Sequence, residues 1–210
     1  MNVILITSAL RPINDHTVFN ASERFTQTLN TIKTTNKIPD KYVVIIEGTK
    51  ITDQEKETFT NLVDYVFCTD VGSLRKSPGE ATLLYRYLTS DHFQSLEINT
   101  VSKLSGRYWL NDNFNWNSFP NNKTVISFLP ISWLNKPLYK TRYYLIPKIH
   151  LEHFILGLKR YLNSLEFLKA WPDIEHCFYE HNIIINSEIY SPEILGVCGF
   201  ITGDNEFVQD

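Results

Sequence analysis

The chain has 210 residues, of which 43% are hydrophobic, and its 20 basic and 23 acidic side chains give a net charge of −3. This length predicts one domain with a substantial core, and the composition excludes an intrinsically disordered chain. The interspersed charges argue against a nucleic-acid partner.

The cysteines Cys68, Cys177 and Cys198 are scattered and form no CxxC pair, so we expect neither a disulfide framework nor a zinc motif. The apolar run at residues 3–10 has no basic flank before it and is too short to span a bilayer. We therefore expect no transmembrane segment and a cytoplasmic protein.

The first third of the chain alternates short apolar runs with amphipathic segments. Buried strands are predicted at 2–7, 42–46 and 65–68. Each helix between them opens on a capping box, formed by Asn20 with Glu23 and by Thr52 with Glu55. The core face of the second helix is predicted to be Phe59, Leu62 and Val63. This order predicts an α/β fold: one Rossmann-like domain with a mostly parallel central sheet flanked by helices.

Polar side chains follow the predicted strands where each strand ends. In open α/β sheets, ligands bind beyond the carboxyl ends of the strands. We therefore predict substrate-binding roles for Ser8, Arg11, Glu47 and Asp70.

The next helix has a strong start signal, with Ser77 predicted as its N-cap, Pro78 as its first residue and Glu80 completing the box. Its apolar stripe is predicted to run through Ala81, Leu84 and Leu88. Arg75, Lys76 and Gly79 beside a helix N-terminus are typical of an anion site. The alternative interpretation is that these cations are ordinary solvated loop charges.

The most informative stretch is residues 96–114, a predicted strand that breaks at Ser105 and Gly106. Lys103 and Arg107 flank the break, and Tyr108 follows with Trp109. An arginine fork suits a phosphate or diphosphate, and an adjacent ring suits a flat base. The alternatives are strand-end charges in water and aromatic side chains that belong to the core.

The second half contains predicted strands at 124–129 and 142–146 and predicted helices at 148–169 and 173–181. Asp173, Glu175 and His176 lie together at a helix start and are candidates for a catalytic base. Acids are also what the first turn of any helix attracts. The pairs His150 with His153 and His176 with His181 lack zinc-motif spacing, so we interpret them as surface histidines.

These parts, in this order, resemble a nucleotide-sugar glycosyltransferase of the GT-A type. Ser77-Pro78-Gly79-Glu80 resembles the helix start of that family, and residues 103–108 resemble the strand that carries its Asp-x-Asp motif. The Lys-x-Ser-Gly-Arg-Tyr string is similar to small transferases for surface glycans of bacteria and large viruses. The resemblance implies a single domain, with a nucleotide-sugar-binding half at 1–110 and an acceptor-binding half at 111–210.

The family's divalent metal (Mn²⁺ or Mg²⁺) binds the Asp-x-Asp carboxylates, but that motif is not found here. Ser105, Gly106 and Arg107 stand in its place, so no metal ligand is predicted. The physical alternative is that Lys103 and Arg107 neutralise the diphosphate directly.

The sequence hypothesis is a glycosyltransferase of polysaccharide biosynthesis that moves a sugar from a nucleoside-diphosphate sugar to a hydroxyl of a glycan or glycolipid. Arg107 and Lys103 would stabilise the leaving diphosphate, and Glu175 or Asp173 would take the acceptor's proton. The alternative is a non-catalytic nucleotide- or glycan-binding module of the same fold. A nucleotidyltransferase is a third option, although residues 8–12 contain no glycine-rich phosphate loop.

Overall fold

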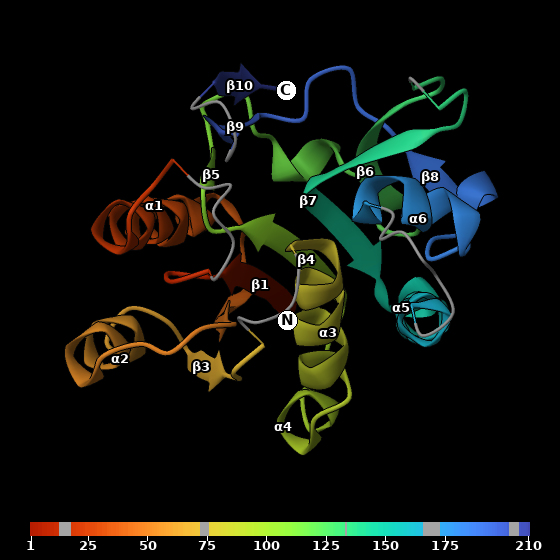
Figure 1. Ribbon diagram of the computed structural model, residues 1–210. Coiled ribbons are helices and arrows are strands. Elements are labelled where there is room, and N and C mark those ends of the chain that lie inside the picture. Colours follow the sequence, from red (N-terminus) through yellow and green to blue (C-terminus); the bar gives the residue numbers. More distant parts are fainter. Residues whose placement is uncertain (13–17, 72–75, 133, 166–172, 202–205) are drawn as a thin grey trace.

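A seven-stranded sheet forms the centre of the computed structural model (Figure 1), which describes residues 1–12, 18–71, 76–132, 134–165, 173–201 and 206–210. The strand order is β3-β2-β1-β4-β7-β6-β8. Six of these strands run in one direction, and β7 runs against them. The predicted α/β fold with a mostly parallel sheet is confirmed. The strands are β1 (Asn2–Ser8), β2 (Lys41–Glu47), β3 (Tyr65–Cys68), β4 (Thr100–Ser105), β6 (Thr124–Leu129), β7 (Leu138–Pro147) and β8 (Ile189–Tyr190).

Helices cover both faces of the sheet because alternate side chains of its central strands are apolar on both sides. Val3 and Leu5 of β1 belong to one core, which α3, α5 and α6 cover. Ile4 and Ile6 belong to the other, which α1 and α2 cover (Figure 1). The helices are α1 (Ala21–Thr34), α2 (Asp53–Thr60), α3 (Lys76–Leu88), α4 (Asp91–Gln94), α5 (Lys148–Ser164) and α6 (Ile174–Glu180), with 3₁₀ turns at Thr35–Lys37, Trp116–Ser118 and Asn186–Glu188.

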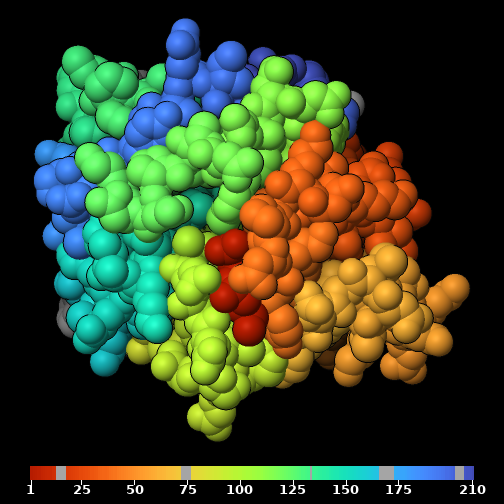
Figure 2. Space-filling model, turned by 180° about the vertical axis from the view of Figure 1, so that it is seen from behind, coloured from red at the N-terminus to blue at the C-terminus, as the bar shows by residue number. Residues whose placement is uncertain are grey.

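A small second sheet lies beside α1. It has the order β10-β9-β5, with β5 at Tyr108–Leu110, β9 at Val197–Phe200 and β10 at Phe207–Gln209. Strand β5 follows β4 after the two-residue turn at Gly106 and Arg107. In the view from behind, the start of the chain, in red, reaches the surface between segments coloured orange and yellow-green (Figure 2).

Both predicted capping boxes form. Asn20 accepts from the backbone N–H of Glu23, and Thr52 accepts from that of Glu55, while each glutamate bonds back to its cap. Two other expectations were wrong. Helix α3 begins at Lys76, so Ser77 lies within its first turn and does not cap it. Leu62 lies beyond the end of α2 and is 52% exposed, so it is not part of the core face.

The longest predicted helix is shorter than expected within the described residues. It was predicted to reach residue 169, but α5 ends at Ser164, and residues 166–172 lie outside the described part of the chain. Asp173 caps α6 and does not belong to it. No helix in the described ranges combines the length and the apolar character needed to cross a bilayer.

The order of the sheet creates a topological switch point. From β1 the chain moves outward to β2 and β3, then returns to β4 on the other side of β1. Thr7 of β1 pairs with Ser105 of β4, and the N–H of Gly106 donates to the carbonyl of Thr7 at 2.9 Å. The crevice beyond the carboxyl ends at such a point is where open α/β sheets bind ligands.

Candidate functional site

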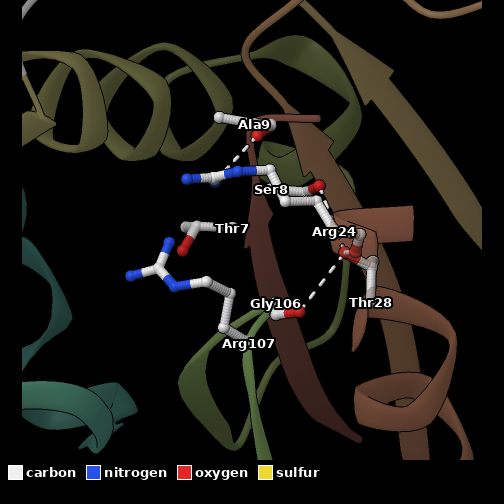
Figure 3. Close-up of a pocket in the computed structure, with 7 residues that line it drawn as sticks. All are labelled: Thr7, Ser8, Ala9, Arg24, Thr28, Gly106 and Arg107. Carbon is white, nitrogen blue, oxygen red and sulfur yellow. Dashed lines mark hydrogen bonds between the residues drawn. The ribbon is translucent and has the colours of Figure 1, made fainter. Parts of the chain in front are cut away.

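A small pocket opens at this switch point, between the carboxyl ends of β1 and β4 and the first turns of α1 (Figure 3). It is a shallow depression, with about 190 Å³ of space when the open solvent at its mouth is included. It has room for one group of a larger ligand at most. The lining residues are Thr7, Ser8, Ala9, Arg24, Thr28, Gly106 and Arg107.

Arg24 enters the pocket from α1. Its side chain is held in place because Nη1 donates to the carbonyl of Ala9 at 3.1 Å, and only 5% of the residue is exposed. Burial, and after it the nearby charge of Arg107, lowers the pKa of Arg24 to about 10, while the carboxylate of Glu47 opposes the shift. At neutral pH the guanidinium remains cationic, so it is a charge that the protein keeps away from water.

Arg107 enters the same pocket from the turn after β4. Its guanidinium and that of Arg24 point to the same side, with Thr7 between them (Figure 3). Burial lowers the pKa of Arg107, while Tyr108 and the carboxylate of Glu80 oppose that shift. Within the described residues, the Nε of Arg107 is buried without a hydrogen-bond partner, so this guanidinium retains a donor for a bound group.

Gly106 allows β4 and α1 to come close enough for the two arginines to share a pocket. A Cβ at this position would lie 2.9 Å from Oγ1 of Thr28 and 3.2 Å from the carbonyl of Thr7. Thr28 donates to the carbonyl of Arg24 at 2.9 Å and contacts that of Gly106 at 3.3 Å. The absence of a side chain at Gly106 therefore sets the width of the pocket.

Glu47, at the end of β2, is fully buried and supports the loop after β1. Its Oε1 accepts from the N–H of Leu10 at 3.2 Å and from the N–H of Thr49 at 2.8 Å. The hydroxyl of Thr49 also donates to this oxygen, whereas Oε2 is buried without a hydrogen-bond partner among the described residues. Burial raises the pKa of Glu47, and these hydrogen bonds oppose the shift. Glu47 thus fixes the backbone that carries Ser8 and Ala9 into the pocket.

Lys103 is fully buried behind the pocket and forms an ion pair with Glu80 of α3. Its Nζ also donates to Oγ of Ser105 at 2.7 Å and to the carbonyl of Thr141 at 2.6 Å. It was predicted to face the diphosphate, but with these contacts its ammonium group faces protein.

A polar chain continues from Lys103 toward α6. Oγ1 of Thr141, on β7, donates to Oε1 of Glu175 at 3.3 Å. Glu175 is partly exposed in the first turn of α6. Glu175, the predicted base, therefore lies on the same edge of the sheet as Arg107. Thr141 links Glu175 to Lys103.

Asp173, the other predicted base, has structural partners. As the N-cap of α6 it accepts from the N–H of His176 at 2.9 Å, and its Oδ1 lies 2.7 Å from Nδ1 of the same ring. The other ring nitrogen lies 2.8 Å from Oγ of Ser132. His176 and His150 are buried, at 2% and 7% exposure, so the interpretation of both as surface histidines was wrong.

The remaining predicted binding residues lie outside the pocket lining. Arg11 points away from it and pairs with Glu55 through both terminal nitrogens, at 2.9 and 2.8 Å. Asp70 is exposed beyond β3, and Gly79 is buried in the first turn of α3. Tyr108 packs into the core under α1. Arg75 and the side chain of Lys76 lie outside the described residues.

Sequence reasoning missed Arg24 and Thr28. They were overlooked because the sequence of α1 offers an apolar stripe at Phe25, Leu29 and Ile32, which predicts the buried face there. The available signal was an arginine with threonines four and seven residues later, on one helical face beside that stripe.

The pocket does not fit the divalent metal that the family resemblance implies. Its charged side chains, Arg24 and Arg107, are both cationic, whereas Mg²⁺ and Mn²⁺ need several oxygen ligands. The carboxylate of Glu80 is paired with Lys103. Among the described residues, one group of metal-ligating side chains lies within 4.8 Å, and it is on and just after α6: Cys177, Glu180 and His181.

Comparisons with known proteins identify a structural likeness only. No protein-family model and no curated protein sequence match the chain. Among solved structures it is similar to a glycosyltransferase involved in the glycosylation of the major capsid of PBCV-1, with a TM-score of 0.49 and 13% sequence identity. The match covers 90% of this chain and 81% of that one.

Proposed function

We propose that the protein is a glycosyltransferase that takes a sugar from a nucleoside-diphosphate sugar. The observation that carries the proposal is the pair of arginines at the switch point of the sheet, Arg24 buried and Arg107 partly buried. Arg107 keeps a buried Nε without a hydrogen-bond partner among the described residues. A diphosphate is an anion of complementary charge, and guanidinium forks match phosphate oxygens.

The chemistry assigned to the arginines is stabilisation of the leaving group. When the bond between the sugar and the diphosphate breaks, negative charge develops on the diphosphate. Two guanidinium groups that already lie in the pocket would stabilise that charge as it develops. Because the pocket does not fit a divalent metal, the proposal gives this role to Arg24 and Arg107.

Glu175 is proposed as the base that takes the proton of the acceptor hydroxyl. It is partly exposed, and the Thr141 hydroxyl orients it from β7. Asp173 is less suited to this role because capping α6 and bonding to His176 already occupy its oxygen Oδ1. A positioned general base typically contributes about 10²–10⁴-fold to the rate.

The proposal is tested by measuring nucleoside diphosphate released from a panel of nucleotide sugars, with EDTA or Mn²⁺ present. Arg107→Met should abolish release and weaken pyrophosphate binding, measured by calorimetry. Glu175→Gln should leave pyrophosphate binding unchanged and reduce transfer by about 10²-fold or more. Arg11→Met, an exposed arginine outside the pocket, is the matched control and should retain activity. Undiminished turnover in Arg107→Met would show that Arg107 does not stabilise the leaving diphosphate.

The second candidate is a binding module without chemistry. The observation that favours it is the absence of a carboxylate pair at the end of β4, where Ser105, Gly106 and Arg107 stand. The same experiment separates the two candidates. Tight nucleotide binding without release of diphosphate, for every donor tried, would favour the module.

A further inference from the structure

Three side chains from the β6–β7 hairpin and from α6 form a hydrogen-bonded line that takes no part in the proposed sugar transfer. Ser132 lies in the hairpin, Asp173 is the N-cap of α6, and His176 lies in the first turn of that helix. Oγ of Ser132 lies 2.8 Å from Nε2 of His176. Nδ1 of the same ring lies 2.7 Å from Oδ1 of Asp173. A hydroxyl, an imidazole and a carboxylate are thus joined in that order.

The carboxylate of Asp173 determines which ring nitrogen of His176 carries the proton. An ionised carboxylate only accepts hydrogen bonds, so in the neutral ring the proton lies on Nδ1 and Nε2 is an acceptor. The hydroxyl of Ser132 is the donor that faces Nε2. The carboxylate is itself held in place, because its Oδ1 also accepts from the backbone N–H of His176 at 2.9 Å. His176 is therefore oriented to take a proton from Ser132.

The turn of the hairpin fixes Ser132 from the other side. Its backbone N–H donates to the carbonyl of Lys136 at 2.9 Å, and its Oγ accepts from the N–H of Leu134 at 3.2 Å. The contacts with Leu134 and His176 use one lone pair and the proton of the hydroxyl, and the second lone pair is the one that would attack a carbonyl carbon. Ser132 is 9% exposed, and Ile131 directly before it is 74% exposed. The serine therefore lies at the surface of the hairpin, next to a buried histidine.

We propose that Ser132, His176 and Asp173 act as nucleophile, general base and orienting carboxylate in the cleavage of carboxylic esters. The mark of an activated serine is a hydroxyl within hydrogen-bond reach of a base that a third group orients, and this constellation recurs on unrelated folds. Esters are the substrate class because their alcohol leaves more readily than the amine of an amide. The activity is separate from sugar transfer, since none of the three residues lines the arginine pocket.

The reaction consists of two acyl transfers without any change of oxidation state. Oγ of Ser132 bonds to the carbonyl carbon while its proton passes to Nε2 of His176. The bond from that carbon to the alcohol oxygen then breaks, and His176 gives the proton to the departing alcohol. Water attacks the acyl group left on Ser132 and its proton returns through His176 to Oγ, which yields the carboxylic acid and the free serine. Asp173 stays ionised and stabilises the imidazolium.

The same three contacts also tie the hairpin to α6, so the test needs a change that keeps the tie and removes the chemistry. Asp173→Asn is such a change. Asparagine caps helices about as well as aspartate, so a purely structural line should tolerate it. It lacks the negative charge that stabilises the imidazolium, so ester cleavage should fall by about 10³-fold or more.

The test treats the full chain, without nucleotide sugar, with a fluorophosphonate probe that phosphonylates activated serines. Peptide mass spectrometry should locate the label on Ser132, and para-nitrophenyl butyrate should release para-nitrophenol with an initial burst. Ser132→Ala should lose both signals. The matched control is Ser164, whose Oγ lies 3.5 Å from Nε2 of His181. Ser164 should stay unlabelled, and Ser164→Ala should retain ester cleavage.

Three results would overturn the triad: no label on Ser132, equal labelling of Ser132 and Ser164, or full ester cleavage by an Asp173→Asn protein that circular dichroism shows to be folded. The first result needs no variant, so it decides the matter even where a substitution disturbs folding. The donor is absent from all of these measurements, and their failure is therefore distinct from a failure of glycosyl transfer.

Discussion

Arg24 of α1 and Arg107 of the turn after β4 lie in one pocket, and the charge of Arg107 helps to lower the pKa of Arg24. The two residues come from elements that the sheet topology brings together at the carboxyl ends of β1 and β4. Burial and the charge of Arg107 both disfavour the charged form of Arg24, and Glu47 opposes that shift. Because phosphate oxygens can accept hydrogen bonds from both guanidinium groups, removal of either arginine should weaken the binding of an anion in this pocket.

Replacing Arg24 with methionine should therefore weaken anion binding. The variant keeps the apolar stem of the side chain and removes its charge, together with its hydrogen bond to the carbonyl of Ala9. Urea denaturation without ligand establishes that the variant is folded. Calorimetry with pyrophosphate should show an affinity reduced about tenfold or more.

Arg11→Met provides the control for that measurement. Arg11 is an exposed arginine whose ion pair with Glu55 lies outside the pocket. Surface pairs contribute ~0–1 kcal/mol, so the change in stability should be small and pyrophosphate binding should be unaltered. A folded Arg24→Met protein that retains full pyrophosphate affinity would contradict the assignment of Arg24 to the anion site.

A methyl group at Gly106 should separate α1 from β4. Its Cβ would lie 2.9 Å from Oγ1 of Thr28, and overpacking of this kind costs about 1–3 kcal/mol. We expect Gly106→Ala to lower the midpoint of thermal unfolding and to weaken pyrophosphate binding. In a Thr28→Ala background, which lacks the contacted atom, Gly106→Ala should cost less stability than it costs in the wild-type protein. Full wild-type stability in Gly106→Ala would show that Gly106 does not set the spacing between α1 and β4.

The ion pair of Lys103 with Glu80 should act as a unit. Removing one partner of a buried pair leaves the other charge uncompensated, so Lys103→Met should destabilise by about 3 kcal/mol. The double variant Lys103→Met with Glu80→Gln should be more stable than Lys103→Met alone, because no unpaired carboxylate remains. A double-mutant cycle in urea measures the coupling. Additive effects would show that the pair does not interact in solution.

Local signals in the sequence predicted much of the fold. The capping boxes at Asn20 and Thr52 set the starts of α1 and α2, and the continuous apolar runs marked the first strands. The break at Gly106 was visible because glycine ended a β-like pattern. The start of α3 was predicted too late. Ser77 was expected to be the N-cap, but in the structure the helix already begins at Lys76.

The candidate site depended on partners that sequence patterns do not reveal. Lys103 shares a face of β4 with Val101, which packs under α3, and the carboxylate that pairs with it comes from Glu80 of that helix. Nothing in the residues around Lys103 identified this partner. Arg24 was missed for a related reason, because the buried face of an amphipathic helix is usually marked by apolar residues, and this buried face of α1 is largely polar.

Glu47 should give the stability of the protein a defined dependence on pH. Burial raises its pKa in the folded state above the ordinary value of 4.5, so the folded protein holds this proton more tightly than the unfolded chain. The stabilisation from the protonated carboxyl is present below pH 4.5 and is lost as the pH rises through the folded pKa.

Glu47→Gln cannot titrate and retains an oxygen for the N–H groups of Leu10 and Thr49. Urea denaturation from acid to neutral pH should show the wild type losing stability relative to this variant as the pH rises. A stability difference that is constant with pH, or that changes in the opposite direction, would contradict the buried-carboxyl interpretation.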